Sequence, residues 1–216
     1  MKLVYLGILL AGAAFAICVP AGGQGAGQVA GADFPACQPI RIASPDQRWA
    51  LTTDSLALNC PGQSAGGAQS AEPAPILLYL RDQRTHRARR VDVVGYGGHV
   101  EWAPDSAAFF VNENVASNEG EASLYRASGL KKLDLREAIL RNDRSAQRYM
   151  DGHSYVRARQ WLGDDIALVQ LCGHRDEAPE VQFDVRYRVS LDGHVRKVSE
   201  KTGAPDMNEC AWSGTQ

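Results

Sequence analysis

The sequence has 216 residues, of which 44% are hydrophobic and 22% are charged, and its formal net charge is −2. These values are ordinary for a folded globular protein, and they argue against disorder across the body of the chain. They also argue against a nucleic-acid-binding protein, because such proteins carry a broad basic excess.

The N-terminal residues have the pattern of a secretory signal peptide. A short basic start precedes an apolar run that reaches Val19, and Ala14-Phe15-Ala16 offers small residues for cleavage. The pattern predicts a signal peptide over residues 1–21, and a periplasmic or secreted protein. Two alternatives are an uncleaved membrane anchor, since the run approaches the length that spans a bilayer, and lipid modification of Cys18.

The next segment, residues 22–36, is rich in Gly, Ala and Gln. This composition is typical of a flexible lead-in without regular structure. We expect the remainder, residues 37–216, to form a single domain. It has no second apolar run long enough to span a bilayer, so the mature protein is expected to be soluble.

A hairpin pattern occurs three times in this domain. In the clearest copy, residues 100–111, an alternating strand leads into the turn Pro104-Asp105-Ser106, and the apolar run Phe109-Phe110-Val111 follows. Proline, Asp and Ser favour such turns, and the apolar run favours a strand. Similar patterns occupy residues 42–51 and, with less regularity, residues 160–169.

The three copies are evenly spaced. Their turn aspartates are Asp46, Asp105 and Asp164, and 59 residues separate each from the next. Each hairpin is followed by a second pair of expected strands that carries a tyrosine. The last pair is joined by Asp192-Gly193, which is typical of a type I′ hairpin turn. Four strands repeated along a chain are the signature of propeller blades.

The motif Trp102-Ala103-Pro104-Asp105-Ser106, together with Ser44-Pro45-Asp46, resembles the hairpin of TolB-type β-propeller repeats over roughly residues 38–200. The resemblance implies blade-like sheets in an exported protein. The first copy has Ala43 in place of the tryptophan, and the third has Gly163-Asp164 in place of Pro-Asp.

Three units are fewer than the typical four to eight blades of a closed ring. We therefore expect an all-β fold of three blade-like antiparallel β units, arranged as a partial propeller or a sandwich, with one short helix. A homodimer that completes a six-unit ring is a geometric possibility.

The expected helix covers Asp134–Arg141. Asp134 and Glu137 have the spacing of a capping box, and Leu135 and Ile139 form an apolar face. Residues 142–150 extend it weakly.

Beyond the expected signal peptide the sequence has four cysteines, Cys37, Cys60, Cys172 and Cys210, which in an exported chain predict two disulfides. From their positions relative to the hairpins we favour Cys37–Cys60 and Cys172–Cys210. The competing pairing, Cys37–Cys210, would tie the two ends of the domain. A zinc site is disfavoured, because no cysteine pair has close ligand spacing.

Two polar clusters have both a functional and a structural interpretation. An arginine-rich turn would suit an anionic partner such as a phospholipid headgroup or an acidic glycan, but we favour a solvated turn that prevents edge-to-edge pairing. An oxygen-rich segment contains ligands that calcium prefers, but we favour a plain polar loop. The members are Arg81, Arg84, His86, Arg87, Arg89 and Arg90 in the first cluster, and Asn112, Glu113, Asn114, Ser117, Asn118, Glu119 and Glu121 in the second.

The aromatic pair Trp102 and Trp161 occupies equivalent positions in two copies. The pair suits sugar stacking, but core packing between sheets is favoured. No catalytic signature is present: Gly-x-Ser-x-Gly, His-Glu-x-x-His and a phosphate-binding glycine loop are all missing. We therefore predict no catalytic, cofactor-binding or metal-binding residues.

The expected function is that of an exported binding module whose partner is a protein or a component of the cell envelope. The alternative is a hydrolase or lyase with a site composed across the repeats, in which His99, His153 and a carboxylate converge. A third possibility is an assembly factor that acts as a dimer.

Overall fold

The computed structural model describes residues 31–34, 39–53, 76–91, 97–116, 119–203 and 210. The expected signal peptide, Cys18 and the expected Cys37–Cys60 disulfide lie outside these residues.

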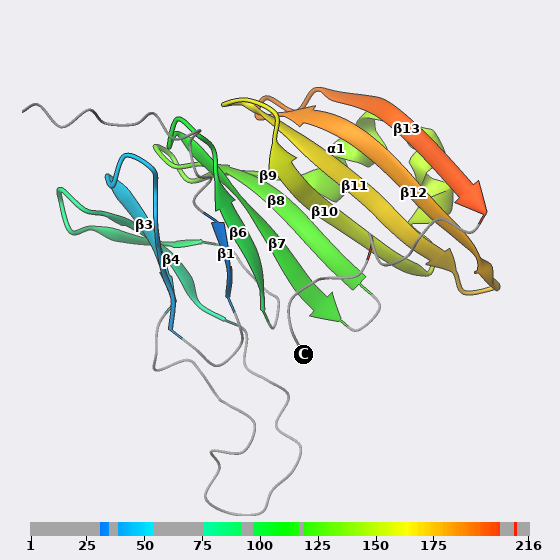
Figure 1. Ribbon diagram of the computed structural model, residues 1–216, viewed down its shortest axis with the longest axis horizontal. Coiled ribbons are helices and arrows are strands. Elements are labelled where there is room, and N and C mark those ends of the chain that lie inside the picture. The colour runs from blue at the N-terminus through cyan, green and yellow to red at the C-terminus, as the bar shows by residue number, and fades with distance from the viewer. Residues whose placement is uncertain are drawn as a thin grey trace, which may run out of the picture.

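The described residues form strands almost throughout, as the sequence predicts, with one α-helix and one 3-10 helix (Figure 1). The elements in chain order are β1 Gly31–Phe34, β2 Arg41–Ala43, β3 Trp49–Thr53, β4 Leu78–Asp82, β5 Ala88–Val91, β6 Gly98–Trp102, β7 Ala108–Ala116, β8 Glu119–Arg126, β9 Lys131–Asp134, α1 Leu135–Asn142, η2 Arg144–Tyr149, β10 His153–Trp161, β11 Ile166–Arg175, β12 Ala178–Ser190 and β13 Val195–Gly203.

The strands form two open sheets. A four-stranded antiparallel sheet has the order β2-β3-β4-β5, and a larger sheet contains the other nine strands. Within the larger sheet, β6 to β9 and β10 to β13 are each paired with their sequence neighbours in antiparallel fashion. The two groups join where β10 runs parallel to β8, at the pairs Ser154–Glu119 and Tyr155–Gly120.

The expectation that residues 22–36 lack regular structure is wrong for Gly31–Phe34. These residues form β1, which pairs antiparallel with β6. Phe34 is fully buried in the core between the two sheets, and Ala32 packs against the same core. Burial of one large aromatic side chain supplies the driving force that the small residues around it lack.

The expected hairpin turns are present at Asp46 and Asp105 and share their details. Gln47 N–H donates to Ser44 O (2.9 Å), and Ser106 N–H donates to Ala103 O (3.0 Å). Each aspartate accepts from the backbone N–H two residues later, at 3.0 Å for Asp46 and 2.9 Å for Asp105. The aspartates therefore fix both turns by the same local hydrogen bond.

The third turn is one residue shorter than the other two. Leu162 N–H donates to Ile166 O (2.8 Å), whereas the second turn is closed by Ala103 N–H and Ala108 O (2.9 Å). Asp164 lies exposed in this bend. Strand β10 itself has a register shift between Ala158 and Gln160.

The hairpin at Asp192-Gly193 is also present, but its turn is not type I′. Gly193 N–H donates to Ser190 O (2.9 Å), and only Gly193, at φ 91°, takes the left-handed conformation. A type I′ turn needs positive φ at both central residues, here Leu191 and Asp192.

Strand β7 is buried on both faces, because it lies between two hydrophobic cores. Phe109 and Val111 face the core shared with the four-stranded sheet, and Phe110 faces the core that contains α1 and β10–β12. This position explains why Phe109-Phe110-Val111 is continuously apolar instead of alternating.

Helix α1 begins as predicted and packs on the core that it shares with β10–β12 (Figure 1). The Asp134 side chain accepts from Glu137 N–H (2.9 Å), and Leu135 and Ile139 are buried. The weak extension of this helix is the 3-10 helix η2.

A disulfide joins Cys172 on β11 to Cys210 near the C-terminus, with Cα atoms 5.9 Å apart. This bond is consistent with the second of the two favoured pairings. It leaves no place for the competing pairing Cys37–Cys210.

Candidate functional site

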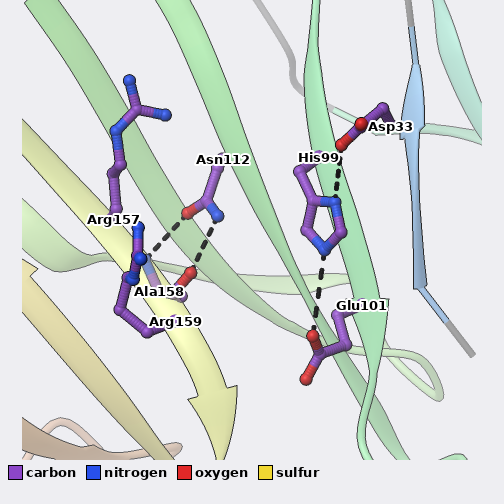
Figure 2. Close-up of a pocket in the computed structure, with 7 residues that line it drawn as sticks. All are labelled: Asp33, His99, Glu101, Asn112, Arg157, Ala158 and Arg159. Carbon is purple, nitrogen blue, oxygen red and sulfur yellow. Dashed lines mark hydrogen bonds and ion pairs between the residues drawn. The ribbon is translucent and has the colours of Figure 1, made fainter. Parts of the chain in front are cut away.

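A cavity with chemically varied walls lies where β1, β6, β7 and β10 meet (Figure 2). Its volume is about 290 Å³. The lining residues combine acidic, basic and amide groups, and they are Asp33, His99, Glu101, Asn112, Arg157, Ala158 and Arg159.

One wall is built by pairing across three neighbouring strands. The register places Asp33 of β1 opposite His99 of β6, and His99 opposite Asn112 of β7. His99 Nδ1 lies 2.9 Å from Asp33 Oδ1, and its Nε2 lies 3.8 Å from Glu101 Oε2 (Figure 2). Glu101 comes two residues after His99, so both side chains project from the same face of β6.

Electrostatics in this wall favour a protonated histidine. Burial by itself would lower the pKa of His99, but the hydrogen bonds and charges of Glu101 and Asp33 outweigh it and raise the pKa. The second carboxylate oxygen of Glu101, Oε1, is buried and makes no hydrogen bond to any described residue. The wall therefore presents a hydrogen-bond acceptor that still lacks a donor.

Asn112 connects this wall to β10. Its Nδ2 donates to Ala158 O, and its Oδ1 accepts from Ala158 N–H, both at 2.8 Å. The side-chain amide therefore takes the place of a neighbouring strand beside the irregular part of β10. Asn112 is 5% exposed, so these bonds are made away from water.

The opposite wall carries two arginines of β10, which lie on the far side of Asn112 from His99 (Figure 2). Arg157 is buried and Arg159 is exposed. Burial, followed by the positive charge of Arg159, lowers the pKa of Arg157 to about 10. Guanidinium groups suit a carboxylate or phosphate, which they bind through paired hydrogen bonds.

The structure brings together residues that the sequence did not connect. Asp33 falls in the expected flexible segment, Asn112 in the expected loop, and Arg157 and Arg159 in no predicted cluster. A sequence signal did exist for the arginines, because two long cationic side chains stand two residues apart in one strand.

Histidines His99 and His153 do not share a cavity among the described residues, although the alternative enzyme function expected them to converge. His99 pairs with Asp33, whereas His153 pairs with Asp176 at the far end of β10. His86 and His194 are exposed in turns.

The tryptophans Trp102 and Trp161 are buried, at 0% and 8% exposed, as the core-packing interpretation predicts. Neither indole has a free face for a sugar. Trp102 Nε1 donates to Ile42 O (3.3 Å) and Trp161 Nε1 donates to Glu101 O (3.2 Å), so each contacts a strand 60 residues earlier.

The arginine-rich turn is the β4–β5 hairpin, and part of it is structural. Arg81 Nε donates to Thr52 Oγ1 (3.1 Å), and an Arg89 guanidinium nitrogen donates to Ala127 O (2.6 Å). Arg84, Arg87 and Arg90 are exposed, which fits the solvated turn that the sequence favours.

The oxygen-rich segment is not a loop, so this expectation is wrong for its described residues. Asn112, Glu113 and Asn114 continue β7, and Glu119 and Glu121 begin β8. Glu121 lies 2.5 Å from Arg136 Nε of helix α1. The polar side chains therefore join strands to each other and to the helix instead of surrounding an ion.

The environment of Glu121 leads us to expect that the stability of the protein depends on pH. Burial raises the pKa of Glu121 to about 7 from 4.5, although Arg136 acts in the opposite direction. The folded state therefore binds a proton that the unfolded state releases between pH 4.5 and 7, so stability rises as pH falls through this range. Because the carboxyl is partly solvated, we expect a gain of about 1–2 kcal/mol between pH 8 and pH 5.

The measurement is urea unfolding of the wild type and of Glu121→Gln at several pH values. The variant should lose this part of the dependence and keep the smaller part from His99, whose raised pKa acts in the same direction. Identical pH profiles for the two proteins would show that Glu121 has an ordinary pKa.

Comparison with models of known protein families gives no match, and comparison with curated protein sequences gives none either. Within the described part of the chain, no helix combines the length and the apolar character that crossing a membrane requires.

Proposed function

We propose that this chain is an exported binding protein built from three blade-like units, and that it binds a small acidic sugar in the cavity between two of them. The units are β2–β5, β6–β9 and β10–β13, and β1 adds to the second. The two tryptophan hydrogen bonds support this division, because each joins a unit to the one before it at the same separation of 60 residues.

Export is proposed from the pattern of residues 1–21, and the disulfide Cys172–Cys210 suits it, because disulfides persist in oxidising compartments. The periplasm or the cell surface is also where acidic glycans of an envelope would be met.

The observation that carries the ligand class is the pair of opposed walls. Arg157 and Arg159 suit a carboxylate, while Glu101 and Asp33 offer acceptors for hydroxyl groups on the other side. A uronic acid has both kinds of group on one small ring. An amino acid is less suitable, because its ammonium group would compete with His99 for the same carboxylates.

Calorimetric titration with glucuronate, and with glucose as the neutral control, tests the proposal. We expect glucuronate to bind with a dissociation constant below about 1 mM, and glucose to give no signal. Arg159→Gln should weaken binding about tenfold or more, because it removes a charged hydrogen-bond donor. Arg188→Gln, an exposed arginine on β12, is the matched control.

Absence of glucuronate binding at about 10 mM, or equal affinities for Arg159→Gln and Arg188→Gln, would refute the ligand class. Binding of a free amino acid in place of glucuronate would redirect the proposal to zwitterionic ligands.

A second candidate, a hydrolase or lyase acting on the same ligand class, is favoured by one observation. The Asp33–His99 pair has the geometry of a general acid held by a carboxylate, with a raised pKa. Incubation with oligosaccharides of glucuronate, followed by chromatography, separates the two functions. Products that disappear in His99→Gln would indicate an enzyme, and no products would leave binding alone.

A further inference from the structure

We propose a second site, independent of the cavity, in which His153 and His174 bind one divalent transition-metal ion with the support of Asp176. One candidate ligand atom from each of these three residues lies within 4.8 Å of the others. Two imidazole donors, with a carboxylate that orients one of them, suit zinc, copper or nickel.

The antiparallel register creates the histidine pair. His153 of β10 is directly opposite His174 of β11, and side chains opposite each other on one face of a sheet are neighbours. Their rings are stacked, with centroids 4.4 Å apart and planes inclined by 20°. No local sequence pattern indicates this pair, because the two residues belong to different strands and have no metal-ligand spacing.

Hydrogen bonding determines which nitrogen of each imidazole ring can bind a metal ion. His153 Nδ1 lies 2.7 Å from Asp176 Oδ1, and His174 Nδ1 lies 3.2 Å from Arg175 O. A carboxylate and a carbonyl only accept hydrogen bonds, so both Nδ1 atoms carry the proton. Both Nε2 atoms are then left with a lone pair, the arrangement found in metal-ligating histidines whose other nitrogen is held by an outer partner.

Two glycines allow this close arrangement. At Gly173, where φ is 148°, a Cβ atom would lie 1.9 Å from His153 O. At Gly152, where φ is 113°, it would lie 3.0 Å from Asp176 N. A larger residue at either position would press on the backbone of His153 or Asp176, and the positive φ values also favour glycine at both positions.

The charges around the cluster suit a cation. A cleft of about 370 Å³ adjoins Asp176 and also contains Asp151, Glu177, Arg148 and Arg175. Arg148 is paired with Glu200 outside the cleft, so three carboxylates face one remaining arginine. Ligand bonds of about 2.1 Å bring tetrahedral ligand atoms to about 3.4 Å from one another, and candidate ligand atoms of the three residues already lie within 4.8 Å.

The test is calorimetric titration of the untagged full-length protein with zinc chloride. We expect one equivalent to bind with a dissociation constant of about 1–10 μM. His174→Ala should weaken binding about tenfold or more, and Asp176→Asn should weaken it about tenfold, as loss of an outer partner typically does. His194→Ala is the matched control, because this histidine also lies beside an aspartate but belongs to no such cluster among the described residues.

Electron paramagnetic resonance with Cu²⁺ gives a readout that does not depend on affinity. The spectrum should show coupling to two imidazole nitrogens in the wild type and to one in His153→Gln. Circular dichroism shows which variants fold. If a histidine variant does not fold, Asp176→Asn, which changes an exposed position, still tests the site. The proposal is overturned by no saturable binding at about 1 mM zinc, or by equal losses in His174→Ala and His194→Ala.

Discussion

Replacing Trp102 by alanine is expected to lower the free energy of unfolding by about 3–5 kcal/mol. The indole is completely buried between the two sheets, where its ring centroid lies 5.0 Å from that of Phe109. Alanine would leave a large cavity there and would remove the hydrogen bond from the indole to Ile42 O. Urea unfolding followed by circular dichroism measures the loss.

Two variants in the β10–β11 hairpin serve as comparisons for Trp102→Ala. Trp161→Ala should cost a similar amount, because Trp161 makes the equivalent hydrogen bond to Glu101 O. Leu162→Ala, at a side chain that is 40% exposed, should change stability by less than about 0.5 kcal/mol. A loss below about 1 kcal/mol for Trp102→Ala would contradict the packing of the four-stranded sheet on β6–β8.

Replacing Asn112 by alanine is expected to destabilise the protein by about 2–4 kcal/mol. The change removes two buried hydrogen bonds and leaves both the N–H and the C=O of Ala158 without partners. An unsatisfied buried polar group costs more than an average hydrogen bond contributes. Chemical denaturation gives the size of the effect, and amide hydrogen exchange at Ala158 shows whether it is local to β10.

Two further variants test whether the bridge, meaning the two hydrogen bonds between Asn112 and Ala158, accounts for the loss. Asn112→Asp keeps the shape but replaces the donor with a carboxylate oxygen, so it should be destabilising as well. Asn114→Ala, two residues along β7 and only partly buried, should have little effect. Equal stabilities for Asn112→Ala and Asn114→Ala would show that the bridge contributes nothing.

Local features of this fold were predictable from the sequence because local chemistry determines them. The turns at Asp46 and Asp105 follow from Pro-Asp pairs, and the start of α1 follows from Asp134 and Glu137. The equal spacing of the turn aspartates also anticipated strand pairs in regular succession. Burial of Trp102 and Trp161 followed from their place at the end of an alternating strand.

The features that create the sites were not predictable in the same way, because they depend on pairing between distant segments. Strand β1 forms only because β6 offers it an edge and a core for Phe34. The strand β7 extends through Asn112 because its polar side chain meets the backbone of β10, which no local pattern reveals. His153 and His174 meet only through strand register.

In our proposal, the two arginines of β10 and the acidic wall of β6 form one receptor for an acidic sugar. The most direct measurement is nuclear magnetic resonance of the arginine Nε–H groups during titration with glucuronate. The signals of Arg157 and Arg159 should shift together and saturate with one affinity, while that of Arg188 stays in place. Shifts spread evenly over all arginines, or none at Arg157 and Arg159, would contradict the claim.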